Sequence, residues 1–213
     1  MTVTQVLTAA KNNLNAESDT LWSESELLIS LYLVCLEMAR ETNCIESTST
    51  SITSTASTAT YTKPTRALDI FRVTYSGTKL QQIDLREMDA MFTNSSASGT
   101  PVFYSFFNDT ITLYPTPSAS SDTIKVWSYN EPATISISST IEIPSIYHDI
   151  LVDGLTHRMC PKDLGHPLTT FWGARWNIGL QKMVTDLKKR KRGDRFAVVK
   201  AEENLITSQQ GMV

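Results

Sequence analysis

The sequence is poor in the residues that build metal centres and disulfide frameworks. Its 213 residues include three cysteines, Cys35, Cys44 and Cys160, and no CxxC pair. Widely spaced cysteines in an odd number predict neither a disulfide framework nor a zinc site. His157 and Cys160 would share one helix face, but no carboxylate pattern completes a metal set there. We therefore expect no metal and no cofactor.

Long apolar runs are also missing. The longest candidate, residues 27–39, is shorter than the roughly eighteen residues that a membrane span needs, and charged residues flank it. The opening stretch, MTVTQVLTAAKNN, lacks the charged-then-apolar order of a signal peptide. We expect a protein that does not contact a membrane. We also expect it to be made and kept in a cytoplasm, or in something assembled there.

Catalytic motifs are missing as well, because the chain has no GxSxG, GxxxxGK[ST] or GxGxxG sequence. His148, Asp149 and Asp153 lie close together in the sequence and could form a general acid/base site. However, acids in the first turns of a helix also favour the helix dipole without any catalysis. We predict no catalytic residue, and we expect His148 and His157 to be half-exposed on a helix.

Helical periodicity marks both ends of the chain. Residues 4–15 predict a short helix capped by Thr4. In LWSESELL, Ser23 and Glu26 form a capping box for a helix that runs to about Thr42. This second helix is apolar on more than one side, which predicts burial inside its own subunit or against another copy.

Two more helices are predicted near the C-terminus, over residues 142–161 and 166–193, with Pro161 and Gly193 as stops. Their expected buried stripes are Ile146, Ile150, Leu151, Leu155 and Met159 in the first, and Phe171, Trp172, Trp176, Leu180, Met183 and Leu187 in the second. The last twenty residues are predicted to form an extended arm.

Between the helical ends, polarity alternates as it does in strands. The pairs Ser76-Gly77 and Asn108-Asp109 predict hairpin turns, and residues 84–92 predict one or two helical turns capped by Asp84. The expected class is α+β. Its expected parts are a helical bundle of residues 1–45 and 143–193, an inserted antiparallel β domain of residues 46–142, and an extended arm of residues 194–213.

A tract of hydroxyl residues stands at the entry to this β region. Eleven of the fourteen residues 47–60 are Ser or Thr. The tract lacks Gly and Pro, so it does not have the composition of a flexible linker, and Thr favours strands. We predict a polar strand pair over residues 46–62 with a turn near 54–57. Ser49, Ser51, Thr53 and Thr55 are expected on its wet face.

Charge is distributed unevenly along the chain. Residues 1–60 hold seven acids and two bases, whereas residues 182–200 hold eight bases and two acids. Five consecutive bases, residues 188–192, exceed what a helix end needs to complement its dipole. The run could contact nucleic-acid phosphates or an acidic surface of a protein partner. No groove-reading motif accompanies it, which argues against sequence-specific DNA binding.

Several segments, taken in order, resemble the tail adaptor proteins of tailed bacteriophages, which are head-to-tail connectors that bind below the portal. They include WSESELLISLYLVCLEMARET, GTPVFYSFFNDTITLYPTP, IKVWSYNEPA and KKRKRGDRF. The resemblance extends over about residues 4–196. It implies a virion structural protein in the neck that forms a homo-oligomeric ring, commonly of twelve copies, coaxial with the portal. It implies no enzymatic activity in most members.

The resemblance also implies partners. The ring would bind the portal protein and tail or nozzle proteins, and it would enclose double-stranded DNA. In the family, the C-terminal helix and arm tend to engage the portal. On this chain that implies a portal-binding set of Lys188, Lys189, Arg190, Lys191, Arg192, Arg195, Phe196, Val198 and Val199.

Two alternatives stay open at the level of sequence. One is a virion-associated enzyme, such as a cell-wall hydrolase, that uses His148, Asp149 or Asp153. The other is a nucleic-acid-binding module that uses the basic segment 188–195.

Overall fold

The computed structural model describes residues 1–16, 21–47, 50–91, 97–162 and 168–192. The helices are α1 (Val3–Asn13), α2 (Glu24–Thr42), α3 (Leu85–Met91), α4 (His148–Met159) and α5 (Thr169–Arg192), with the 3₁₀ turns η1 (Ser145–Tyr147) and η2 (Cys160–Lys162). The strands are β1 (Thr50–Thr53), β2 (Thr60–Thr62), β3 (Ala67–Tyr75), β4 (Thr78–Lys79), β5 (Gln81–Gln82), β6 (Ser98–Gly99), β7 (Phe103–Phe107), β8 (Thr110–Tyr114), β9 (Thr116–Pro117) and β10 (Thr123–Asn130). The predicted α+β class is confirmed.

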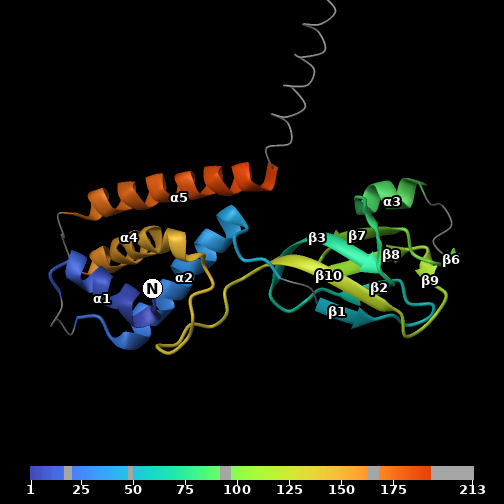
Figure 1. Ribbon diagram of the computed structural model, residues 1–213, viewed down its shortest axis with the longest axis horizontal. Coiled ribbons are helices and arrows are strands. Elements are labelled where there is room, and N and C mark those ends of the chain that lie inside the picture. Colours follow the sequence, from blue (N-terminus) through green and yellow to red (C-terminus); the bar gives the residue numbers. More distant parts are fainter. Residues whose placement is uncertain (17–20, 48–49, 92–96, 163–167, 193–213) are drawn as a thin grey trace, which may run out of the picture.

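The elements gather into two lobes at opposite ends of the molecule (Figure 1). The helical lobe consists of α1, α2, α4 and α5 with the two 3₁₀ turns, and the β lobe consists of the strands with α3. Each lobe has its own apolar core. In the helical lobe, α4 lies in the middle and packs against α1, α2 and α5. Residues from the two ends of the chain therefore share one core, which contains both Leu31 and Leu155.

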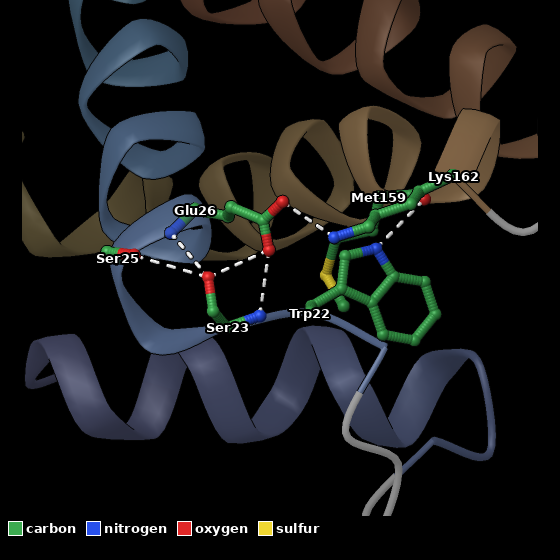
Figure 2. A network of polar contacts seen from close by, with 6 residues as sticks. All are labelled: Trp22, Ser23, Ser25, Glu26, Met159 and Lys162. Atoms are coloured by element: carbon green, nitrogen blue, oxygen red, sulfur yellow. Dashed lines mark hydrogen bonds and ion pairs between the residues drawn. The ribbon is translucent and has the colours of Figure 1, made fainter.

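Helix α2 begins where the sequence predicts, because its start is encoded by local contacts (Figure 2). The Ser23 hydroxyl accepts a hydrogen bond from the backbone of Glu26, and the Glu26 carboxylate accepts one from the backbone of Ser23. Asn43 follows the last residue of α2 as its C-cap and has a φ of 52°. Asn tolerates this left-handed conformation better than most residues do.

The predicted cap of α1 is wrong. Thr2, not Thr4, caps this helix: its hydroxyl accepts from the backbone of Gln5 at 3.2 Å, and the Gln5 side chain accepts from the backbone of Thr2 at 2.9 Å. The fully buried Val3 explains the earlier start, because including it in the first turn carries its side chain into the core.

The strands form two four-stranded sheets, ordered β1-β10-β3-β4 and β2-β8-β7-β5, and a small pair β6-β9. Both predicted hairpin turns are confirmed. Ser76 and Gly77 have φ values of 46° and 86°, and Asn108 and Asp109 have φ values of 48° and 62°, which are the positive angles of the hairpin turns that match strand twist. The predicted short helix is also confirmed as α3, and the Asp84 carboxylate accepts from the backbone of Arg86.

The Ser/Thr tract is only partly as predicted. It contains two strands with a turn at Ala56–Ser57, but β1 pairs with β10 and β2 pairs with β8, so the two strands do not pair with each other. The Tyr61 hydroxyl donates to the carbonyls of Thr58 and Thr55 and holds the connecting loop as the chain passes from one sheet to the other. A uniform Ser/Thr tract fixes strand register poorly, which explains the error.

The expected wet face of the tract is confirmed where the structure describes it. Ser51, Thr53 and Thr55 are exposed, whereas Ser49 lies outside the described residues. The buried Ser54 accepts from the backbone of Asp122 at 3.0 Å and donates to the carbonyl of Ala119 at 3.2 Å.

Polar contacts join the two lobes. Arg66 of the β lobe donates through Nε to the carbonyl oxygen of Glu131 at 2.9 Å and forms an ion pair with Glu142. Arg40, near the end of α2, lies 3.9 Å from the Glu131 carboxylate. Leu68 of β3 packs against the core of the helical lobe. The β lobe is therefore anchored at its base by charged and apolar contacts.

Candidate interaction surfaces

Helix α5 is seated on α4 by an unusually close approach. Trp172, Trp176 and Met183 of α5 are buried in the helical core. A Cβ atom on Gly154 of α4 would lie 2.6 Å from Cε3 of Trp176 and 2.8 Å from Cγ1 of Val34. Only a residue without a side chain fits there, so Gly154 sets how closely α2, α4 and α5 meet.

The stripe predicted for α5 is partly wrong. Phe171 belongs to the expected buried set but is 50% exposed, whereas Leu180 and Leu187 are partly buried against the core. Ile146 of the preceding segment is also wrong, since it is 57% exposed. Residues 145–147 form a 3₁₀ turn instead of a turn of α-helix, and Tyr147 takes the buried position.

The basic run lies at the far end of α5. Lys188 and Lys189 are exposed on the helix. Residues 190–192 belong to α5, but the structure does not describe their side chains. Four members of the predicted portal-binding set, Arg195, Phe196, Val198 and Val199, lie outside the described residues, as does the predicted arm.

The structure separates the residues of the predicted acid/base group. His148, expected to be half-exposed, is 5% exposed. Its Nε2 lies 2.9 Å from the carbonyl oxygen of Ile143 and its Nδ1 lies 2.8 Å from the backbone nitrogen of Met1. Since the carbonyl can only accept, Nε2 carries the proton, and both ring nitrogens are occupied by structural bonds.

The two aspartates have different environments. Asp149 is exposed, and Asp153 accepts from Nε of Arg175 at 3.1 Å. Partial burial raises the pKa of Asp153, although the nearby Arg175 opposes the shift. Asp153 thus helps to tie α4 to α5, and the three residues do not converge on one point.

His157 is half-buried, as expected, and lies in a groove of about 480 Å³ between α2, α4 and α5. Its ring packs on Gly173, whose added Cβ would lie 3.0 Å from the imidazole Cε1. An ion pair between Glu37 and Arg158, at 2.9 Å, lines the same groove. Over the described residues, no group of three or more His, Cys, Asp or Glu side chains is arranged to hold a metal ion.

The N-terminal end of α2 is clamped to the end of α4 (Figure 2). Lys162 Nζ lies 2.6 Å from a carboxylate oxygen of Glu26, and Trp22 Nε1 donates to the carbonyl oxygen of Met159 at 3.3 Å. The Lys162 bond, followed by the bonds from Ser23, lowers the pKa of Glu26 from its ordinary value of 4.5 to about 2.

The outer side of α2 exposes apolar side chains. Ile29 is 61% exposed and Leu33 is 39% exposed, and half-buried apolar residues flank them. We call this surface the α2 outer face; its residues are Leu28, Ile29, Tyr32, Leu33 and Leu36. On α5, Phe171 and Ile178 are exposed by 50% and 54%. The helical lobe thus has apolar surface on two different helices.

A second basic surface lies on the β lobe, and the sequence gives no sign of it. Arg72, Lys79 and Lys125 come from three different strands and are all exposed. The Arg72 guanidinium lies over the Trp127 ring, 4.5 Å from its centre. The cluster depends on strand pairing across more than forty residues, which spacing along the chain does not reveal.

An apolar helix face and two separate basic surfaces are features of a protein that works by binding other macromolecules. The chain matches the family model described as SU10 adaptor protein over residues 1–200, and it belongs to that family. This confirms the resemblance to phage head-to-tail adaptors and makes the protein a structural adaptor of a bacteriophage virion. A search of curated proteins found no match. Among the described helices, none is both long and apolar enough to cross a membrane.

Proposed function

We propose that this adaptor forms a homo-oligomeric ring, of twelve copies as is common in the family, between the portal and the tail in the neck of the virion. The ring extends the DNA channel and provides the platform for tail or nozzle proteins. In this role the protein works by assembly and has no enzymatic activity. It assembles in the host cytoplasm.

The observation that carries the proposal is the α2 outer face. Exposed Ile29 and Leu33 lie side by side on one helix, together with half-buried apolar neighbours. Burying such side chains against a second copy is worth about 25 cal/mol per Å² of apolar surface removed from water. This face belongs in a subunit contact.

The contact in the ring is heterologous. A ring of many copies needs two different, complementary surfaces on each subunit, whereas a two-fold dimer needs one self-complementary surface. Apolar side chains are exposed on two different helices, Ile29 and Leu33 on α2 and Phe171 and Ile178 on α5. Two separate apolar surfaces favour contact between α2 of one copy and α5 of the next.

We further propose a role for each part of the subunit. Residues 1–45 and 143–193 form the bundle that builds the ring, and residues 46–142 form the inserted β domain. The basic end of α5, residues 188–192, continues into the arm 194–213, and together they dock on the portal. The exposure of Lys188 and Lys189 supports a contact with an acidic partner surface.

The test is the pair of substitutions I29E/L33E. Both side chains are exposed in the subunit, so the melting temperature of the monomer should change little, whereas two charges in the contact should abolish the ring. Mass photometry of wild type and variant measures the copy number. The matched control is Phe107→Glu, at the tip of the β7–β8 hairpin, where Phe107 is 62% exposed. A variant that still forms the wild-type ring would refute the role of the α2 outer face.

A further inference from the structure

Strand pairing assembles a row of residues on one face of the sheet β1-β10-β3-β4. Lys125 of β10 pairs with Thr74 of β3, and Thr74 pairs with Lys79 of β4. On the other side, Lys125 pairs with Ser51 of β1. Directly paired residues point to the same face, so two lysines and two hydroxyl residues share this row.

A third base lies in the next row. Arg72 is two residues before Thr74 on β3, and it pairs with Trp127, which is two residues after Lys125 on β10. Side chains two apart on a strand point to the same face, about 7 Å from each other. We call the exposed residues Arg72, Lys79, Lys125 and Ser51 the basic sheet face; Thr74 lies in the same row but is only 2% exposed.

The bases of this face have no acidic partners. Ion pairs occur elsewhere in the described chain, and none includes Arg72, Lys79 or Lys125. The acids on the same side, Asp69 and Glu46, pair in register with Tyr129, one row beyond Trp127. Three cations gathered without counter-charges repel each other in the free protein. An anionic ligand removes that repulsion, so the face is suited to one.

The aromatic residues beside the bases indicate which anion fits. Trp127 has one side covered by Arg72, and the rings of Tyr129 and Phe71 lie 4.7 Å apart, centre to centre. The side of the Trp127 ring that Arg72 covers is closed to stacking with a base of a nucleic acid, whereas the three cations themselves are exposed. Arg, Lys and Ser side chains are groups that bind backbone phosphates, and such contacts read no sequence.

We propose that the basic sheet face binds the phosphate backbone of double-stranded DNA independently of sequence. The stacking on Trp127 holds the Arg72 guanidinium in place, so its free N–H groups can bind a phosphate with less loss of side-chain freedom. The proposal goes beyond the ring, because a single subunit carries the whole face. It also differs from DNA contact by residues 188–195.

The experiment measures the salt dependence of binding. Fluorescence anisotropy with two unrelated 25-base-pair duplexes, between 50 and 200 mM salt, gives the slope of log affinity against log salt. Three phosphate contacts make that slope steeper by about 2.7. R72Q/K79Q/K125Q should therefore lose this part of the slope with both duplexes. Over the fourfold salt range, wild type should weaken about 40-fold more than the variant.

Two further variants make the result specific. K79Q/K125Q leaves the Arg72–Trp127 contact intact and should make the slope shallower by about 1.8, which guards against a folding defect in the triple variant. K11Q/R86Q/K182Q removes three bases from α1, α3 and α5, gives the same net charge, and should keep the wild-type slope.

An unchanged slope in the sheet variants overturns the proposal. If those variants instead fail to bind a purified tail or portal protein, the face binds an acidic protein surface and not DNA. Ring formation by the same variants, followed by mass photometry, reports on the proposed function separately, because none of the three bases belongs to the α2 outer face.

Discussion

The contact at Gly154 offers the sharpest test of how the helical lobe is packed. In Gly154→Ala, the new Cβ would lie 2.6 Å and 2.7 Å from two ring atoms of Trp176 and 2.8 Å from Cγ1 of Val34. Favourable carbon–carbon separations are about 3.5–4.0 Å. The overlap is therefore close to 1 Å with three atoms, and both neighbours are themselves buried in the core.

Two terms of opposite sign set the size of the effect. Forcing an extra carbon into a packed core costs about 1–3 kcal/mol. Replacing Gly by Ala inside a helix stabilises the folded protein by about 1 kcal/mol. Since Val34 is fully buried and Trp176 is only 5% exposed, we expect the upper part of the range. The free energy of unfolding should fall by about 1–2 kcal/mol.

Urea unfolding followed by tryptophan fluorescence measures this change, because Trp22, Trp172 and Trp176 all lie in the helical core. The control is Ala174→Gly, at an exposed position of α5, which should lose about 1 kcal/mol and calibrate the helix-propensity term. If Gly154→Ala is more stable than wild type by that calibrated amount, the close approach of α4 and α5 is refuted.

Two further predictions concern ionisable groups. Because the pKa of Glu26 falls from 4.5 to about 2 on folding, its contribution to stability is complete above pH 4.5 and is lost as the pH falls through 2. Urea unfolding at pH 2–5 measures how the free energy of unfolding depends on pH. E26Q should flatten this dependence, while the neighbouring E24Q should keep that of the wild type. Burial raises the pKa of the Cys35 thiol to about 12, so Cys35 should resist a thiol reagent at pH 8 until the protein unfolds, whereas half-buried Cys44 should react first. Mass spectrometry of labelled peptides measures both rates, and rapid labelling of Cys35 in the folded protein would contradict its burial.

Features encoded by neighbouring residues could be predicted from the sequence. The capping box of Ser23 and Glu26 needs only four residues, and the turn at Asn108-Asp109 needs only two. Strand partners could not be predicted in the same way. In the Ser/Thr tract, every register offers nearly the same side chains, so the pairing of β1 with β10 depends on contacts between residues 70 to 76 apart in the sequence.

The same distinction between local and long-range features applies to the candidate interaction surfaces. The basic run 188–192 is visible in the sequence because its residues are consecutive. The basic sheet face is not visible, because Arg72 and Lys125 become neighbours only through the pairing of β3 with β10. The burial of His148 was missed for a related reason: its partners are Ile143 and the distant Met1.

Electron microscopy of the purified protein, alone and mixed with its portal, tests the central claim most directly. The account predicts closed rings with a central channel in end-on views, twelve copies in each ring, and coaxial stacking on the portal. A protein that stays monomeric in both samples, or that assembles into open filaments without binding the portal, would contradict it.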